Sequence, residues 1–371
     1  MEHIEAKKIL IVTQEFPPRV GGAGVVGYQN ARALASLGHE VTVVSLGNKA
    51  DYQGQPFKII VARRFSKVWI FALYFILKCI KLNSVDTIIL NDIGASLVFA
   101  LFFNNKNILA KTLIYLHGGE PSVVLQKPNF LYRVVGFRQK YLSLLHNSKA
   151  LIAVSNYMRD YLIRAIPGSI DLTKFQVVYA GVDSNIFNYS PMDLHQQLGI
   201  PQDHDILLSV SRIVKEKGYD MQLKLFSQIV SVNPKFHWLI IGDGPYLAEL
   251  QKLVKDKNLN NNVTFLGKIR REELPKYYSS SNLLWLLSRA ESFGLVFTEA
   301  QMCGLPVLAL KISGVVEAVV PGITGFLVDD ASESITYILN REYYKLSPDK
   351  IFLYSRTFDV RNTIKGLALL L

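Results

Sequence analysis

The sequence predicts an α/β protein made of two Rossmann-like, doubly wound domains that face a central cleft. Short apolar runs of strand length alternate with helical stretches, which is typical of parallel sheets with helices on both faces. The alternation pauses in a turn-rich segment at residues 183–193 and then begins again. A chain of 371 residues is also too long for one ordinary core. We therefore expect a first domain over residues 1–185, a second over 186–352, and a helical tail over 353–371.

In the first domain, residues 7–13 (KKILIVT) form the expected first strand. A loop with the sequence QEFPPRVGGAG then leads into a helix that stops near Gly38. Further strands are expected at residues 40–46, 57–62, 87–90, 112–116, 150–154 and 175–179, with helices at 66–82, 95–103 and 130–147.

In the second domain, the expected elements begin with a strand at residues 206–210 and a helix at 219–230. A strand at 237–241 then ends in a Gly-Asp-Gly-Pro turn. Further strands are expected at residues 263–266, 283–287, 307–309 and 325–328. The carboxyl ends of parallel strands meet at one edge of a sheet, so ligands should bind there.

The formal net charge is +11, and the first domain carries nearly all of it. Residues 1–185 hold 21 Lys and Arg against 11 Asp and Glu, whereas residues 186–371 hold 20 against 19. This asymmetry predicts an anionic partner for the first domain, unless it serves only to keep the surface soluble. The basic residues are scattered and not interleaved with aromatic residues, so we favour an anionic membrane surface over nucleic acid.

The expected helix at residues 66–82 (SKVWIFALYFILKCIKL) is apolar on every side, with lysines near its ends. It fits either a buried core helix or a helix in a membrane interface, with aromatic rings at depth and lysines at the headgroups. The longest apolar run, residues 68–77, is shorter than the roughly 20 residues that span a bilayer. Acidic residues at the N-terminus predict no secretory signal. Two cysteines, Cys79 and Cys303, fit a reducing compartment.

The stretch Arg289-Ala-Glu-Ser-Phe-Gly-Leu-Val-Phe-Thr-Glu299 follows the apolar strand at residues 283–287 and reads into a helix. Glu291 would lie on the loop at the carboxyl end of the strand, and Glu299 about a turn and a half into the helix. The backbone N–H groups at a helix start favour an anion. Amides for a phosphate and two carboxylates for hydroxyls together suit a sugar nucleotide.

Gly22-Ala23-Gly24-Val-Val-Gly27 formally matches the dinucleotide fingerprint G-x-G-x-x-G, but two features argue against that interpretation. Gly22 lies nine residues beyond Thr13, and the second strand ends in Ser-Leu-Gly-Asn without the acid that would bind a ribose. The segment fits a long loop that brings amides close to a phosphate or an acceptor hydroxyl, or a simple helix-entry turn.

Three further side chains follow strand ends. Arg212 and Lys217 could hold a diphosphate, with Lys215 as a competing candidate and solvated loop charge as the alternative. His117 ends a strand and precedes two glycines, although a lone histidine is more often structural. No metal site is predicted, because the chain has no Cys/His set at zinc spacing. Asp203 and Asp205 fit turn capping better than metal binding.

Together these segments resemble the retaining GT-B glycosyltransferases of family 4, which include bacterial mannosyl- and glucosyltransferases. The likeness covers nearly the whole chain. It rests on F-P-P-R-V-G-G-A-G, L-H-G-G-E, V-V-Y-A-G-V-D, S-V-S-R-I-V-K-E-K-G, I-I-G-D-G-P and, most specifically, E-S-F-G-L-V-F-T-E, which matches the family's E-x7-E. The chain departs from the family at Tyr179-Ala-Gly181, where Pro-Asn-Gly is usual, and at Ser313-Gly314, where Gly-Gly is usual.

The resemblance implies a role for each matching residue. Glu299 would bind the ribose hydroxyls of the nucleotide, and Glu291 would contact the donor sugar. The amides of Phe293, Gly294 and Leu295 would contact the donor sugar and its phosphate, and Arg212 and Lys217 would bind the diphosphate. His117 would contact the transferring sugar. Gly22, Ala23 and Gly24 would lie beside the phosphate and the acceptor, and Ile269 would lie near the base. The tail at residues 353–371 would be a helix that crosses back to the first domain.

The resemblance therefore implies a hexosyltransferase. It would take the hexosyl unit from a UDP-, GDP- or ADP-sugar, with retention of configuration and without a cofactor or a required metal. We expect a lipid-linked or cell-envelope saccharide acceptor, and a cytoplasmic enzyme peripheral to the inner membrane face. A non-catalytic nucleotide-binding or scaffold protein on the same fold is the alternative. A dinucleotide-dependent enzyme is disfavoured by the missing acid after the second strand.

Overall fold

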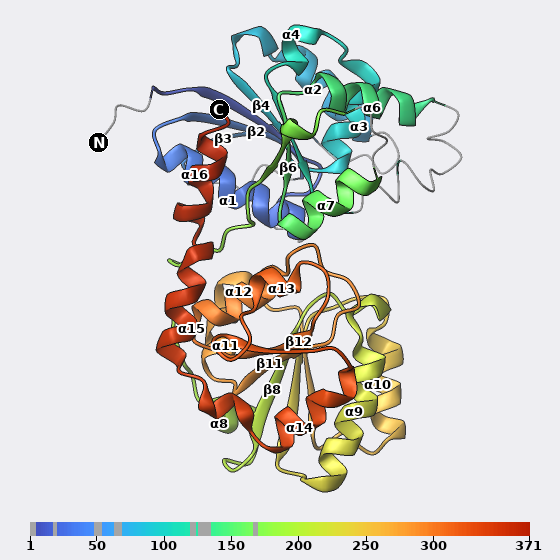
Figure 1. The fold of residues 1–371 in the computed structure, drawn as a ribbon, viewed down its shortest axis with the longest axis vertical. Helices are drawn as coiled ribbons and strands as arrows, with labels where there is room; N and C mark the ends of the chain where they lie inside the picture. The colour runs from blue at the N-terminus through green and yellow to red at the C-terminus, as the bar shows by residue number, and fades with distance from the viewer. Residues whose placement is uncertain are drawn as a thin grey trace. The chain divides into compact units, whose positions relative to one another are not determined.

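The computed structural model describes residues 5–17, 21–47, 54–62, 69–118, 124, 135–165 and 170–371. The chain divides into two compact units. The first contains Met1–Gly181 together with Val360–Leu371, and the second contains Val182–Asp359. Each unit is an α/β sheet structure, as the sequence predicts (Figure 1).

The first unit holds a parallel sheet of seven strands in the order β3-β2-β1-β4-β5-β6-β7. Its strands are β1 (Lys8–Val12), β2 (Glu40–Leu46), β3 (Lys58–Ala62), β4 (Thr87–Leu90), β5 (Thr112–Leu116), β6 (Ala150–Ala153) and β7 (Phe175–Val177). Its described helices are α1 (Gly22–Ser36), α2 (Trp69–Cys79), α3 (Ile93–Phe102), α4 (Lys106–Leu109), α6 (Phe137–Asn147), α7 (Asn156–Ala165) and α16 (Val360–Ala368).

The helices α2, α3 and α6 pack in one layer of the first unit, and α1 packs against α16 (Figure 1). The strands β1, β4 and β5 are buried along their length, apart from the first residue of β1, because helices cover both faces. Of the helices expected at residues 66–82 and 130–147, residues 66–68 and 130–134 lie outside the described residues.

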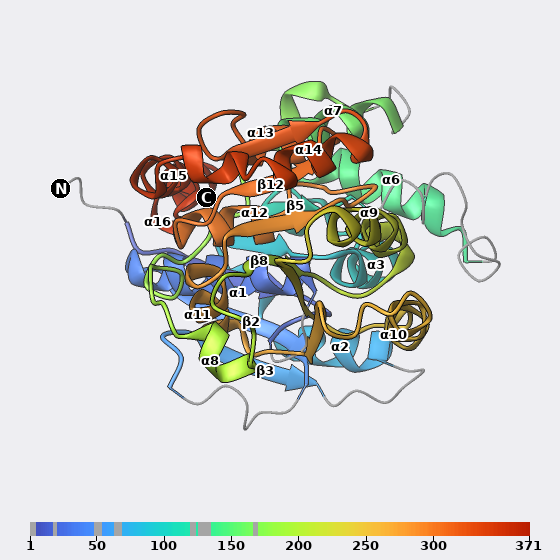
Figure 2. The ribbon, with the colours of Figure 1, turned by 90° about the horizontal axis from the view of Figure 1, so that it is seen from below.

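The second unit holds a parallel sheet of six strands in the order β10-β9-β8-β11-β12-β13. Its strands are β8 (Asp205–Val210), β9 (Phe236–Ile241), β10 (Val263–Gly267), β11 (Leu283–Leu286), β12 (Val307–Leu310) and β13 (Gly325–Val328). Its helices are α8 (Leu194–Leu198), α9 (Tyr219–Val232), α10 (Leu247–Asp256), α11 (Leu274–Ser279), α12 (Leu295–Met302), α13 (Val315–Ala318), α14 (Ser334–Leu339) and α15 (Pro348–Ser355). Helices α9 and α10 lie on one side of this sheet, and α11 and α15 lie on the other (Figure 2).

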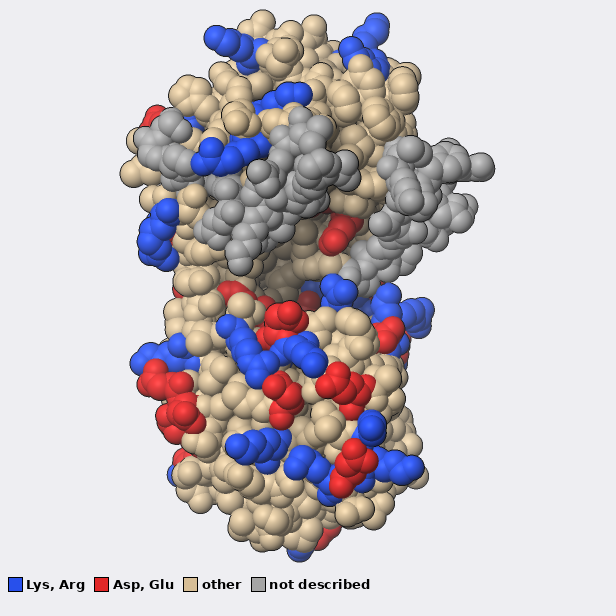
Figure 3. All heavy atoms as spheres, turned by 90° about the vertical axis from the view of Figure 1, so that its right-hand side faces the viewer, with Lys and Arg blue, Asp and Glu red and all other residues tan. Residues whose placement is uncertain are grey.

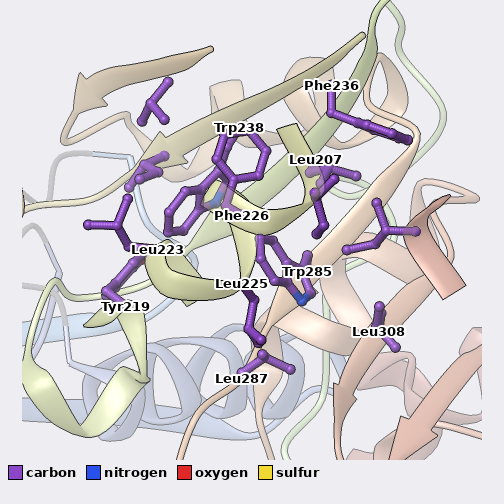
Figure 4. Packing of buried hydrophobic residues seen from close by; sticks show 14 of the residues in the cluster. Leu207, Tyr219, Leu223, Leu225, Phe226, Phe236, Trp238, Trp285, Leu287 and Leu308 are labelled. Atoms are coloured by element: carbon purple, nitrogen blue, oxygen red, sulfur yellow. The ribbon is translucent and has the colours of Figure 1, made fainter. Parts of the chain in front are cut away.

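The core of the second unit is centred on two tryptophans in its sheet, Trp238 of β9 and Trp285 of β11 (Figure 4). Their ring centroids are 5.5 Å apart, and Phe226 of α9 lies 5.5 Å from Trp238. Trp238 Nε1 donates to Ser209 Oγ at 2.9 Å, and Ser209 Oγ donates to the Trp285 carbonyl at 2.5 Å. These contacts fix β8, β9 and β11 against one another, and the loops that follow β8 and β11 carry the candidate site.

The sequence predicts one helical tail over residues 353–371, but the structure divides this segment between the end of α15 and α16. It breaks at the short 3-10 turn Arg356–Phe358, and residues up to Asp359 belong to the second unit. The backbone N–H of Val182 donates to the Phe358 carbonyl at 2.8 Å. The chain therefore passes between the units at Gly181–Val182 and again at Asp359–Val360, a few residues away from the expected boundaries at 185 and 353.

A buried histidine in β9 gives the second unit a predictable dependence on pH. His237 is 5% exposed, and its Nε2 lies 2.9 Å from Thr264 Oγ1 of β10. Its Nδ1 has no hydrogen-bond partner among the described residues. Burial, with a smaller effect of His204 and His195, lowers the pKa of His237 to about 4.

Because the unfolded chain takes up this proton near pH 6.5 and the folded chain only near pH 4, acid favours the unfolded state across that window. The unfolding free energy of the second unit should fall by up to about 3 kcal/mol as pH drops from 6.5 to 4. Urea unfolding of the His237→Gln variant should lose this contribution, whereas the exposed His146→Gln variant should behave as wild type. If the unfolding free energy fell equally steeply between pH 6.5 and pH 4 in wild type and in His237→Gln, the prediction would be wrong.

Candidate active site

The candidate site in the second unit lies where the strand order reverses. The chain runs outward from β8 through β9 to β10, and then returns beside β8 with β11. Loops at the carboxyl ends of two strands diverge at such a point and leave room for a ligand. The loop after β8 carries Arg212 and Lys217, and the loop after β11 carries Glu291.

Lys217 and Glu291 form an ion pair, with Lys217 Nζ 2.5 Å from Glu291 Oε1. The side chains are 23% and 11% exposed, so the pair is largely shielded from water and still reachable. Arg212 is exposed on the same loop and has no carboxylate partner among the described residues. Lys215 points elsewhere, with its Nζ 3.4 Å from Glu249 and over the ring of Tyr246. The competing candidate is thus separated from the pair.

The turn that holds Lys217 is fixed by Arg289, which sequence reasoning did not select. Arg289 Nη1 donates to the Lys215 carbonyl at 2.6 Å, and its Nη2 lies 2.8 Å from Asp220 Oδ2. The next residue after Lys217 is Gly218, which has φ of 76°. A Cβ there would lie 2.1 Å from the Leu287 carbonyl oxygen, so only glycine lets the two loops approach this closely.

Glu299 is buried in α12, with 4% of its surface exposed. Arg271 donates to its Oε1 from Nη2 at 2.5 Å and from Nε at 3.1 Å. Tyr278 of α11 donates to its Oε2 at 3.3 Å. Burial and the adjacent Glu299 carboxylate raise the pKa of Tyr278 well above its ordinary value, so the phenol keeps the proton that it donates.

Arg271 was not predicted as a site residue. Its guanidinium also lies over the ring of Phe187 at 4.6 Å, so the Glu299 carboxylate and an aromatic face both constrain it. Arg271 follows the loop after β10, on which the predicted base-contacting residue Ile269 is half-buried. Nothing in the run Ile-Arg-Arg-Glu-Glu distinguishes Arg271 from its solvated neighbours, because its partner is 28 positions away.

The start of α12 lies between the two carboxylates. Gly294 is the residue before the helix, with φ of 91°, and Leu295 is the first helical residue. The side chain of Phe293 is 2% exposed and packs on Phe358 at 5.1 Å, so only its backbone could serve a ligand. The helix start therefore offers amides between Glu291 and Glu299, as expected.

The loop before α13 also contacts Glu291. The N–H of Gly314 donates to the Glu291 carbonyl at 3.1 Å. Ser313 has φ of 48°, a left-handed conformation that glycine adopts without cost. Ser313 therefore adopts the left-handed backbone conformation that suits the glycine usual at this position, although serine adopts it less readily.

In the first unit, the strand order reverses between β1 and β4, and the loops after these strands form a hydrogen-bonded network. Gly22, Ala23 and Gly24 open α1. A Cβ at Gly24 would lie 2.9 Å from the Glu15 carbonyl oxygen, whereas Gly22 has open space around it. Asn91 Nδ2, just after β4, donates to the Ala23 carbonyl at 2.8 Å. Residues 18–20 of the predicted glycine loop lie outside the described residues.

His117 follows β5 and joins the same network. Its Nε2 lies 2.8 Å from the carbonyl oxygen of Asn91, and since a carbonyl only accepts, Nε2 carries the proton. Its ring stacks on Tyr115 at 5.7 Å. The structure thus brings His117 and the start of α1 to one residue, Asn91. Gly119 and Glu120 of the predicted L-H-G-G-E segment lie outside the described residues.

Asp92 is the central acceptor of this network, and sequence reasoning missed it. Its Oδ2 accepts from Thr13 Oγ1 at 2.6 Å and from the N–H groups of Gln14 and Glu15 at 2.6 and 3.0 Å. Its Oδ1 accepts from the Ala95 N–H at 2.8 Å, which caps α3. The buried carboxylate therefore sets the start of the loop that leads to the glycines.

We expect the Asp92→Ala variant to lower the unfolding free energy of the first unit by about 3 kcal/mol, because several buried donors lose their partner. Hydrogen exchange of the Gln14, Glu15 and Ala95 amides should accelerate together. The matched control is Asp86→Ala, which removes one exposed hydrogen bond to the Lys8 N–H and should cost less than about 1 kcal/mol. Equal effects of the two substitutions would contradict the assigned role.

Among the described residues, no group of three or more His, Cys, Asp or Glu side chains is arranged to hold a metal ion. In the same part of the chain, no helix has both the length and the apolar character needed to cross a membrane.

Comparison with known proteins identifies the class that this fold and site define. Residues 192–346 match the family model for glycosyl transferases group 1, and residues 20–185 match the model for glycosyltransferase family 4. The two models together cover most of both units. The chain therefore belongs to the glycosyltransferases of group 1 and family 4, and it is a GT-B glycosyltransferase.

Several relatives align along most of the chain, including the two that follow. N-acetyl-alpha-D-glucosaminyl L-malate synthase of Bacillus anthracis is 28% identical over 84% of this chain and 81% of its own length. A GDP-mannose-dependent monoacylated phosphatidylinositol monomannoside mannosyltransferase of Corynebacterium glutamicum is 24% identical over 90% of this chain and 89% of its own.

Among solved structures, HepE of Anabaena in complex with UDP and glucose has a TM-score of 0.76 at 24% identity, with 98% of each chain covered. Sucrose-phosphate synthase of Thermosynechococcus elongatus has a TM-score of 0.80 at 22% identity, again with 98% of each chain covered. At these identities the likeness shows the fold.

Proposed function

We propose that this protein is a retaining hexosyltransferase that moves a hexosyl unit from a nucleotide-diphosphate sugar to a lipid-linked or cell-envelope saccharide at the cytoplasmic face of the membrane. The observation that carries the proposal is the Lys217–Glu291 pair at 2.5 Å, at the point where the strand order reverses. Sugar and diphosphate are adjacent in such a donor, so a carboxylate for the one and a cation for the other must also be adjacent.

The same geometry supports separate tasks for the two carboxylates. Glu291 stands beside the cation, where it can accept from the sugar hydroxyls. Glu299 is held by Arg271 and Tyr278 on the other side of the α12 start, a place suited to the ribose hydroxyls. The amides at the start of α12 lie between them and face the negative charge of the diphosphate.

In the proposed reaction, the bond between the anomeric carbon and the diphosphate oxygen breaks. The acceptor oxygen bonds to the same face of the sugar, and the departing diphosphate takes the acceptor proton. Arg212 and Lys217 stabilise the negative charge that develops on the diphosphate, a contribution of several kcal/mol in a site of low water content. The proposal therefore needs no metal. His117 is the candidate for contact with the transferring sugar.

The names of similar proteins support this substrate class without choosing within it. They include a GDP-mannose-dependent mannosyltransferase, the alpha-monoglucosyldiacylglycerol synthase of Streptococcus pneumoniae, and structures of HepE with UDP or UDP-glucose. A thermal-shift screen of UDP-, GDP- and ADP-sugars should raise the Tm with one base class. Product NMR with the stabilising donor should then show a retained anomeric configuration. If none of the three classes raised the Tm and none was hydrolysed, the proposal would be wrong.

A further inference from the structure

The helical layer of α2, α3, α4 and α6 in the first unit contains no acidic residue. The sequences of all four helices lack Asp and Glu. Basic side chains are exposed on the same elements, namely Lys78, Lys106, Arg138 and Lys140. On the face of the molecule in Figure 3, the second unit mixes both signs of charge, whereas the first shows Lys and Arg with few acidic side chains. The layer is therefore cationic and not merely part of a basic domain.

Helix α2 presents large aromatic rings on this layer. Phe71 and Phe75, one turn apart, are 50% and 63% exposed, whereas Leu73 and Leu77 on the opposite side are fully buried. One side of α2 therefore enters the core and the other carries aromatic residues toward solvent. The helix is not wholly buried, and the sequence interpretation of a helix in a membrane interface stays a prediction.

The exposed rings belong to a cluster that is braced from α3. Phe71 lies 6.0 Å from Phe102, and Tyr74 lies 4.5 Å from Phe102 and 6.0 Å from Phe103. Lys78 places its ammonium 5.7 Å from the centre of the Tyr74 ring. A side chain of this kind keeps its charge at the level of lipid headgroups while its stem and the neighbouring rings lie deeper. We call Phe71, Tyr74, Phe75, Phe102 and Lys78 the aromatic–lysine face; Lys106 of α4 is exposed on the same helical layer, in which α4 packs against α6.

We propose that the aromatic–lysine face docks on an anionic phospholipid bilayer, with Phe71 and Phe75 inserted among the acyl-chain ends nearest the headgroups. Charge complementarity selects this occupant, since a cationic layer without carboxylates is attracted to a negatively charged leaflet and repels a second copy of itself. The inference rests on the membrane-face acceptor of the proposed function and identifies the surface that holds the enzyme there.

The test is co-sedimentation of the full chain with vesicles of phosphatidylcholine alone or with phosphatidylglycerol. Wild type should bind the anionic vesicles, and binding should fall as salt is raised. Phe71→Ser/Phe75→Ser should weaken partitioning by roughly tenfold per ring, because each loses apolar area that the lipid covers. Lys78→Glu/Lys106→Glu should weaken it by at least about fivefold per site.

Matched controls lie on the second unit. Leu353→Ser removes an apolar side chain that is more exposed than Phe71 or Phe75, and Lys224→Glu reverses an exposed charge on α9. Both variants should bind as wild type does. The Tm and the donor-induced Tm shift should be unchanged in the α2 variants, so failure of docking is separable from failure of the proposed chemistry. Absence of wild-type binding to anionic vesicles would overturn the proposal. The proposal would also be overturned if the Phe71→Ser/Phe75→Ser variant bound anionic vesicles as wild type does. The same holds if wild type were a dimer and this variant became a monomer without weaker vesicle binding.

Discussion

Replacing Lys217 with alanine should lower kcat/KM for hexosyl transfer by a factor of about 100 to 1,000. The ammonium is the charge nearest to Glu291, and removal of one preorganised group that faces developing negative charge typically costs about 3–4 kcal/mol of transition-state stabilisation. The loss should be greater in kcat than in KM, because the charge on the diphosphate grows as the glycosidic bond breaks.

Lys215→Ala is the matched control for this substitution. It removes a cation from the same 3-10 turn, but its ammonium points to Glu249 and the Tyr246 ring. We expect its kcat/KM to stay within about threefold of wild type, since exposed ion pairs contribute little. Steady-state kinetics of both variants, with Tm as a check on folding, would decide the assignment. A large loss in Lys215→Ala with a small one in Lys217→Ala would reverse it.

The sequence predicts the two sheets well because buried parallel strands are continuous apolar runs. The runs at β8 and β11 end just before Ser211-Arg212 and Ser288-Arg289, which places the loops of the site at the correct edge of the sheet. The strand order itself adds what the sequence does not contain. Only the structure shows that β8 and β11 are neighbours, and therefore that Lys217 and Glu291 form a pair.

Other features could not be predicted, because they depend on partners that are distant in the sequence. Arg271 and Asp92 have no periodic signal, and each is identified only by what it contacts across tens of residues. The packing of the Phe293 side chain against Phe358, which leaves only the predicted backbone amide for a ligand, likewise joins residues that are far apart in the sequence. The break of the tail before Val360 likewise reflects tertiary contacts, since the sequence remains compatible with helix throughout.

We propose two roles for Glu299, support of the fold and binding of the donor ribose. A single substitution would not separate them, so the test requires a double-mutant cycle with Arg271. Glu299→Gln should lower the unfolding free energy of the second unit by roughly 3 kcal/mol, because Arg271 then remains largely buried without a counter-charge. It should also weaken nucleotide binding by about 100-fold, because two charge-assisted hydrogen bonds to the ribose are lost. Arg271→Met alone should cost similar stability by leaving the carboxylate unpaired.

Arg271→Met/Glu299→Gln separates the two effects. Replacing both members of a buried pair with neutral groups of similar size is often nearly neutral for stability, so most of the lost unfolding free energy should return while nucleotide binding stays weak. The control pair is Lys276–Glu273, which is more exposed than Arg271–Glu299 and close to Arg271 in the sequence. Substitution of this pair should leave both quantities as in wild type, because exposed ion pairs contribute little. Urea unfolding and calorimetric nucleotide titration measure the two quantities.

A stable double variant that binds the nucleotide as wild type does would mean that Glu299 only supports the fold. A stable double variant that does not bind would mean that this buried carboxylate, held in place by Arg271 and Tyr278, recognises the donor.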